Sequence, residues 1–113
     1  MNQYVMLIGC SLGRHRFVVT NDCRFDIPAG AMFSTLSSRR NKLVAGEVVL
    51  EANGPTIEVD LRILSVEFWR KPHDCVPYGH HASVEFDGSD VEALKQYLVE
   101  HPSPWHVLLS SGS

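Results

Sequence analysis

The densest group of chemistry-bearing side chains lies between residues 73 and 81. It comprises His73, Asp74, Cys75, His80 and His81. Zinc accepts nitrogen, sulfur and oxygen ligands of these types. The spacing matches neither C-x2-C nor H-x3-H, and adjacent histidines at the start of a strand point to opposite faces. A Cys–His pair could instead serve nucleophilic catalysis, but no orienting third group and no oxyanion site is visible in the sequence. We therefore predict no metal, no cofactor and no enzymatic activity.

A second candidate is a contact surface. Glu67 and Trp69 alternate along one expected strand, so they share the face opposite its apolar residues. An indole is favoured at interface hot spots and stacks on unpaired bases, and a carboxylate accepts hydrogen bonds. The alternative is that the N-terminal segment or the late helix covers this face, which would make Trp69 part of the core.

Basic residues form a third candidate. Arg39, Arg40 and Lys42 lie together in the sequence, and with Arg70 and Lys71 they could hold a phosphate or an acidic partner. The alternative is a solvated hairpin. The predicted partner-binding residues are Glu67, Trp69, Arg70, Arg39 and Arg40.

Composition limits the partners. The chain has 113 residues, with 10 Lys and Arg against 13 Asp and Glu, giving a formal net charge of −3. This length predicts one domain over residues 1–113. The acidic balance argues against binding of duplex DNA, which needs a clustered excess of basic residues. The longest apolar run, residues 4–8, is too short to cross a membrane, and without a preceding basic segment we expect no signal peptide.

The cysteines bear on the compartment. Cys10, Cys23 and Cys75 are odd in number and widely spaced, which does not match a disulfide framework. Three scattered thiols are typical of a reducing compartment, so we expect a cytoplasmic protein.

These candidates must be positioned by short strands. Alternation and β-branched residues predict strands at residues 17–20, 25–27, 31–36, 48–50, 82–87 and 105–109, whereas residues 4–8 fit either a strand or the start of a helix. Turn-forming or polar residues predict connections at 9–13, 28–30, 37–42 and 72–80, and the Asn53-Gly54 pair is a strong hairpin signal.

One helix is expected after the last alternating strand. Residues 89–92 (SDVE) match a capping box that starts at Ser89. Apolar residues at helical spacing follow, namely Val91, Leu94, Tyr97 and Leu98. This pattern predicts a short amphipathic helix that ends near Pro102, and residues 110–113 are expected to fray.

The segment 56–69 carries the most information about the fold. The apolar residues Ile57, Val59, Leu61 and Ile63 alternate with charged residues, but after Ile63 the apolar positions become Leu64, Val66 and Phe68. Because the side-chain period of a strand is two, this change of parity requires a β-bulge, a sharp coil or a change of sheet. Together with the regular short strands, it predicts a small closed antiparallel β-barrel with one short C-terminal helix.

Four motifs in order resemble one known family. Residues 64–71 (LSVEFWRK) resemble the V-E-M-F-R-K strand of domain 2 in translational GTPases, elongation factor Tu above all. Residues 25–35 are similar to the F-x-I-x-G-x-G-T-V-V-T-G segment of that domain, residues 45–49 to its P-G-D-x-V turn, and residues 76–84 to A-x-x-G-D-N-V-G. The order and rough spacing agree from about residue 17 to residue 94. The resemblance implies a six-stranded barrel.

The departures from that family limit what the resemblance implies. No P-loop is present, so GTP binding is not expected. In the family, the glutamate of the V-E-M-F-R-K motif lies at the pocket for the terminal adenosine of aminoacyl-tRNA, and Glu67 matches it. However, Thr35 and Leu36 replace the Gly-Arg pair of the family, and His80 replaces the acidic residue of its last loop.

These observations lead to one expectation and one alternative. We expect a non-enzymatic binding module that engages a protein, or less readily RNA, and the resemblance implies a component of the translation machinery as the partner. The alternative is a small regulatory or toxin-neutralising protein of the immunity type, which would bind through acidic loop residues such as Asp87, Asp90 and Glu92.

Overall fold

The computed structural model describes residues 3–52, 56–102 and 105–111. In chain order the elements are β1 (Val5–Gly13), β2 (Arg16–Asn21), β3 (Ile27–Pro28), β4 (Met32–Val44), β5 (Glu47–Ala52), β6 (Ile57–Phe68), β7 (Lys71–His73), β8 (Cys75–Val76), β9 (His81–Asp87), α1 (Val91–Glu100) and β10 (His106–Ser110). The prediction of a mainly β protein with one helix near its C-terminus is therefore confirmed for the described residues.

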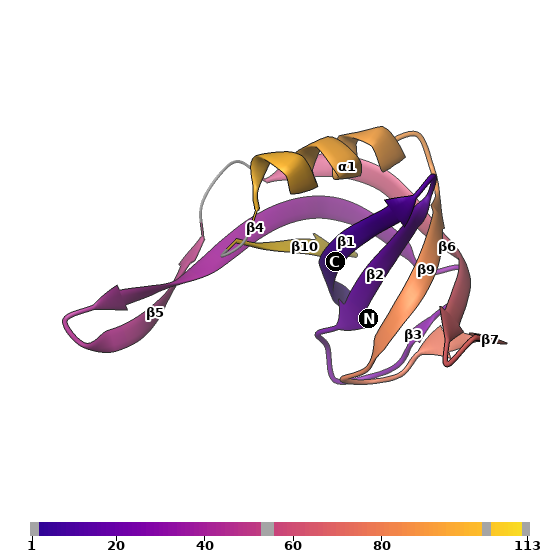
Figure 1. The fold of residues 1–113 in the computed structure, drawn as a ribbon, viewed down its shortest axis with the longest axis horizontal. Coiled ribbons are helices and arrows are strands. Elements are labelled where there is room, and N and C mark those ends of the chain that lie inside the picture. The colour runs from indigo at the N-terminus through magenta and orange to yellow at the C-terminus, as the bar shows by residue number, and fades with distance from the viewer. Residues whose placement is uncertain (1–2, 53–55, 103–104, 112–113) are drawn as a thin grey trace.

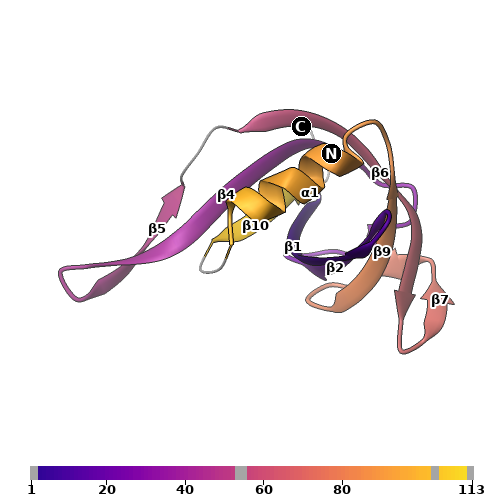
Figure 2. The ribbon, with the colours of Figure 1, turned by 45° about the horizontal axis from the view of Figure 1, so that its top comes forward.

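Antiparallel pairing joins most of the strands into one sheet. The strand order is β5-β4-β10-β1-β2-β9-β6-β7, and β4 also pairs with β6. This extra pairing connects β4, β10, β1, β2, β9 and β6 into a ring of hydrogen-bonded neighbours (Figure 1). The far half of β4 leaves the ring and pairs with β5, so the two strands project as a ribbon (Figures 1 and 2).

The core lies inside the ring of strands. Its largest buried side chains include Phe17, Phe33 and Phe86, from three different strands. The ring centroid of Phe86 lies 5.7 Å from that of Phe17 and 6.4 Å from that of Phe33. Aromatic pairs at these separations contribute about 0.5–1.5 kcal/mol beyond their burial. The three rings therefore hold opposite parts of the sheet together.

Helix α1 closes over the core with one side only. Val91, Leu94 and Tyr97 are buried, as the helical spacing predicts. The hydroxyl of Tyr97 donates a hydrogen bond to Oγ of Ser38 at 3.0 Å, so the polar end of this buried ring has a partner on β4. The predicted capping box is wrong, because Asp90 is the N-cap and makes no side-chain cap.

The predicted change of parity in the long strand is confirmed as a bulge. The register of β6 against β9 shifts between Ile63 and Ser65. Ile63 is buried before the shift and Val66 after it. Two residues of the predicted apolar sets are exposed instead: Ile57, at the start of β6, at 36%, and Leu64, which lies within the bulge, at 47%. On the other side of β6, Ile63 exchanges backbone hydrogen bonds with Gly30 and Ala31 of 2.8 and 3.0 Å, which fix the bulge in place.

Several expected connections are strands instead. Residues 9–13 continue β1, where Gly9 packs so close to β2 that a Cβ would lie 3.3 Å from the carbonyl oxygen of Val18. Residues 37–42 continue β4, because β10 and β5 supply backbone partners on this stretch. The two glycines of the first segment and the polar, basic composition of the second favoured connections, but tertiary hydrogen bonding overrides these local preferences.

The remaining secondary-structure predictions are confirmed in part. The strands predicted at 17–20, 31–36, 48–50, 82–87 and 105–109 are confirmed, and residues 5–8 belong to a strand rather than a helix. The strand predicted at 25–27 shrinks to the short pairing of β3 with β8, and the loop predicted at 72–80 contains β7 and β8. The expected fraying is wrong for Ser110 and Ser111, because Ser111 bonds to Tyr4. The hairpin signal at residues 53–55 lies outside the described residues.

The connection from β9 to α1 presses directly on β6. Gly88 has a φ of +137°, and a Cβ at this position would collide with the backbone carbonyl of Asp60. Two residues later, the carboxylate of Asp90 accepts a hydrogen bond from the amide of Asp60 at 2.6 Å. The helix is thus fixed to the sheet by a contact that only glycine permits.

We predict that Gly88→Ala lowers the free energy of unfolding by more than about 3 kcal/mol, because the methyl group adds a backbone collision to an unfavourable φ. The matched control is Gly79→Ala, where φ is +74° but the space is open. That change should cost only about 1 kcal/mol, the strain term alone. Urea unfolding measures both values, and equal losses would contradict the proposed role of the Gly88 contact.

Candidate functional site

The turn that joins β6 to β7 has an unusual backbone. Phe68 pairs with Lys71 across the two strands, so Trp69 and Arg70 form a two-residue turn. Their φ angles are +53° and +61°. Two positive φ values are the mark of a type I′ hairpin turn, which usually carries Asn-Gly or a similar pair. Side chains larger than glycine make this conformation costly, by about 1–2 kcal/mol for each residue.

The side chain of Trp69 points into solvent. It is 80% exposed, so the alternative that Trp69 belongs to the core is wrong. Its place also differs from the expected one, because β6 ends at Phe68 and Trp69 lies in the turn. Glu67, at the end of the strand, is exposed as predicted and lies between Pro72 of β7 and Ser83 of β9.

Aromatic rings pack against one another next to the turn. Phe68 is partly buried and meets Trp69 edge-on, with ring centroids 5.6 Å apart. Phe68 also stacks in parallel on His73, with centroids 3.4 Å apart. Nε2 of His73 donates a hydrogen bond to the backbone carbonyl of Phe68 at 3.2 Å. The ring of His80 lies 6.4 Å from that of Phe68. We call Phe68, Trp69, Arg70, His73 and His80 the turn cluster.

The predicted basic residues do not meet at the turn. Arg39 and Arg40 lie on β4 where it runs between β10 and β5, whereas Arg70 lies at the end of the β6–β7 hairpin, on the far side of the molecule (Figures 1 and 2). Arg39 pairs with Asp22 at 3.0 Å. The guanidinium of Arg40 lies 4.6 Å from the ring centre of Trp105, a cation–π contact. The five predicted partner-binding residues therefore divide into two groups.

The histidine and cysteine group is also spread out. His73 and His80 belong to the turn cluster, whereas His81 is hydrogen-bonded through Nδ1 to Thr20 at 2.6 Å. Burial raises the pKa of the Cys75 thiol, and the negative charges of Asp26 and Asp74 raise it further. A nucleophilic cysteine needs the opposite shift. Within the described ranges, no three His, Cys, Asp or Glu side chains are placed to hold a metal ion.

The acidic loop residues all have intramolecular partners. Asp87 pairs with Arg62 at 3.0 Å and Glu92 with Lys95 at 3.3 Å. The carboxylate of Asp90 is bonded to the backbone of β6, as described above. The negative charge of the surface considered for binding a toxin is therefore partly balanced by Arg62 and Lys95 of the same chain.

Sequence reasoning missed a groove beside α1. Its cavity volume is about 550 Å³, and α1, β1 and β10 supply the lining. A signal was present in the sequence, because Val99 adds a further apolar side chain beside the core stripe of the helix. In the structure this side chain is 74% exposed.

No helix in the described part of the chain is long and apolar enough to span a membrane.

The strained turn generates a stability prediction. Arg70→Gly should raise the free energy of unfolding by about 0.5–1 kcal/mol, because glycine removes the steric cost of positive φ but adds entropy to the unfolded chain. Arg70→Ala is the matched control, since it removes the charge and keeps the Cβ. Chemical denaturation distinguishes the two. A gain for alanine as large as the gain for glycine would contradict backbone strain as the cause.

The raised pKa of the Cys75 thiol leads to a prediction about its reactivity. In a Cys10→Ser/Cys23→Ser background, Asp26→Asn should speed alkylation by iodoacetamide at about pH 8 by roughly threefold. Removing a neighbouring negative charge lowers the thiol pKa and so raises the thiolate fraction below that pKa. Asp60→Asn, on another part of the sheet, is the control. An unchanged rate for Asp26→Asn would contradict the electrostatic influence of Asp26 on this thiol.

Comparisons with known proteins do not add an assignment to this geometry. No protein-family profile matches the chain, and neither curated proteins nor solved structures give a significant match.

Proposed function

We propose that this protein is a non-enzymatic binding module and that its contact surface is the turn cluster. The observation that carries the proposal is Trp69, an indole 80% exposed at the tip of a hairpin whose two turn residues both have positive φ. A large apolar side chain in that position costs free energy twice, through its backbone strain and through its exposure to water. Strain of this kind clusters at sites where a fixed geometry is needed for function.

The surroundings of Trp69 suit it to recognition. The tryptophan side chain has few rotatable bonds, so little entropy is lost when it is fixed at an interface. Phe68 and His73 stack beneath the turn and restrict its movement. Glu67 and Arg70 flank the indole in the sequence with opposite charges, which can orient a partner. A preorganised anchor between two charges matches the anatomy of an interface hot spot.

We further propose that the ring of strands is a closed six-stranded barrel of the kind found in domain 2 of translational GTPases. The pairing of β4 with β6 and the bulge after Ile63 support a barrel, because bulges let a strand coil around a closed sheet. In that comparison the V-E-M-F-R-K motif falls on the end of β6 and the following turn. The turn cluster would then lie next to Glu67, which matches the glutamate at the family's pocket for the terminal adenosine of aminoacyl-tRNA.

A protein partner is favoured over RNA. The net charge is −3, and the contacts of Arg39 with Asp22 and of Arg40 with Trp105 hold those two side chains away from the turn. RNA binding depends on cations that neutralise phosphates, and Arg70 and Lys71 are the basic residues that the turn itself provides. A component of the translation machinery remains the candidate that the resemblance implies. The free thiols of Cys10, Cys23 and Cys75 support a reducing, cytoplasmic setting.

Affinity capture from native lysate tests the proposal. The wild-type protein, Trp69→Ala and Leu12→Ala serve as baits, each with and without ribonuclease. Leu12 is the matched control, since it is 54% exposed but lies near the β1–β2 turn. We expect one protein partner that survives ribonuclease, is retained by Leu12→Ala, and binds Trp69→Ala about 30-fold more weakly, as at a hot spot of 2 kcal/mol or more.

Two outcomes would contradict this proposal. Loss of the partner after ribonuclease, with binding that weakens steeply as salt is raised, would indicate RNA recognition instead. Equal capture by Trp69→Ala and the wild type would show that the indole is not the contact.

A further inference from the structure

The groove beside α1 is apolar along most of its length. Leu7 of β1, Leu98 and Val99 of α1, and Pro102 and Trp105 after the helix line it. Its volume of about 550 Å³ lies within the range of about 300–1,000 Å³ that is typical of small-molecule sites. The side chains on its wall are ones that a globular protein usually buries, and Val99 is nevertheless 74% exposed.

One wall of the groove is fixed before any ligand arrives. The guanidinium of Arg40, a residue of β4, lies over the ring of Trp105. No residue of β4 is among the described residues that line the groove. His101 meets the same indole edge-on, with centroids 6.1 Å apart, and stacks on Tyr97 at 4.1 Å. Nδ1 of His101 donates a hydrogen bond to the carbonyl of Tyr97 at 2.9 Å. The indole is therefore preorganised, which lowers the entropy cost of binding.

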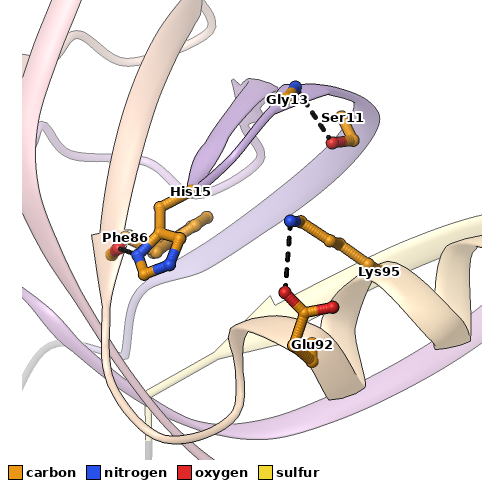
Figure 3. A network of polar contacts seen from close by, with 6 residues as sticks. All are labelled: Ser11, Gly13, His15, Phe86, Glu92 and Lys95. Atoms are coloured by element: carbon orange, nitrogen blue, oxygen red, sulfur yellow. Dashed lines mark hydrogen bonds and ion pairs between the residues drawn. The ribbon is translucent and has the colours of Figure 1, made fainter.

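The charge in the groove has one sign. Among the described residues that line it, Lys95 is the one with a permanent charge, and neither aspartate nor glutamate is present. The other titratable groups on the wall are His101, His106 and the thiol of Cys10. The Lys95 side chain is 28% exposed and reaches from α1 toward the β1–β2 turn (Figure 3). A partly buried ammonium at the end of an apolar surface is complementary to a monoanion with an apolar body.

A second, polar hollow adjoins this end. It is lined by Arg14, His15, Glu85 and Glu92, and Lys95 lines it as well. The two hollows therefore share Lys95, so its ammonium stands where an apolar wall gives way to a polar one. On the polar side, the carboxylate of Glu92 forms an ion pair with the ammonium of Lys95 at 3.3 Å (Figure 3). The side chain of Glu92 is 81% exposed. An exposed ion pair contributes little free energy, so a ligand carboxylate can replace Glu92 at little cost.

We propose that the groove binds a small amphipathic carboxylate, such as a medium-chain fatty acid. The apolar chain lies against Trp105, Leu98 and Val99, and the carboxylate pairs with Nζ of Lys95. The site is separate from the turn cluster, because α1, β1 and β10 form it while β6 and β7 carry the turn. The proposal therefore does not depend on the function assigned to Trp69.

Fluorescence of Trp105 provides the test. A Trp69→Phe variant leaves Trp105 as the sole indole, since the chain has two tryptophans. This variant is titrated with decanoate and, separately, with decanol, below the concentrations at which either aggregates. We expect a saturable change with both ligands and a dissociation constant about tenfold lower for decanoate.

Three further substitutions and one control substitution in the same background locate the site. Lys95→Gln should weaken decanoate about tenfold and leave decanol unchanged, and Lys71→Gln, an exposed lysine on β7, is the matched control that should change neither. Glu92→Gln should strengthen decanoate about two- to threefold, because it frees the ammonium. Val99→Glu should weaken both ligands, because it places a charge on the apolar wall.

Other outcomes overturn the proposal. The absence of a saturable signal with decanoate would exclude the site. Equal affinities for decanoate and decanol, unaffected by Lys95→Gln, would show that the charge plays no part. A concentration-dependent dimer in light scattering that Val99→Glu dissociates, together with no binding of decanoate, would show that a second copy of the chain fills the groove.

Discussion

The pairing of β4 with β6 is the constraint on which the rest of the structure depends. Without it, the sheet would be an open ribbon with two long edges and no interior. Phe33 and Leu61 face each other across this pairing, and both are almost completely buried. The backbone bonds between Ile63 and residues 30 and 31 extend the same contact to the bulge. The pairing joins segments far apart in the sequence, so it carries a loop-closure cost that the burial of the core must offset.

The bulge after Ile63 determines what β6 presents to solvent. It moves one residue out of the ladder, so Val66 turns inward and Glu67 turns outward at the end of the strand. The next two residues then form the strained turn. Because the steric cost of that turn is local, it does not spread into the core that Phe17, Phe33 and Phe86 form. The strand thus combines a well-packed portion with a strained tip, the arrangement that the proposed binding role requires.

The sequence predicted the features that depend on side-chain periodicity. The alternation of Val59, Leu61 and Ile63, the change of parity after Ile63 and the helix core at Val91, Leu94 and Tyr97 are all local patterns. The failures are positions where a distant partner decides. Residues 37–42 are a strand because β10 and β5 lie on either side. The N-cap is Asp90 rather than Ser89, and the carboxylate of Asp90 is bonded to the backbone of β6. The exposure of Trp69 was left open, since alternation places a residue on a face without saying what covers it. The separation of Arg39 from Arg70 depends on the path of the whole sheet.

The helix shows why the groove calls for an explanation. A helix that only closes a core needs one apolar stripe. Helix α1 has that stripe in Val91, Leu94 and Tyr97, but Leu98 and Val99 continue the apolar surface around its side, toward Trp105 and β1. Lys95 lies on the same side and provides the charge. Trp105 in turn is held by Arg40, a residue whose sequence neighbours suggested a binding patch of its own. The contact of Arg40 with the indole gives this residue a structural part beside the groove.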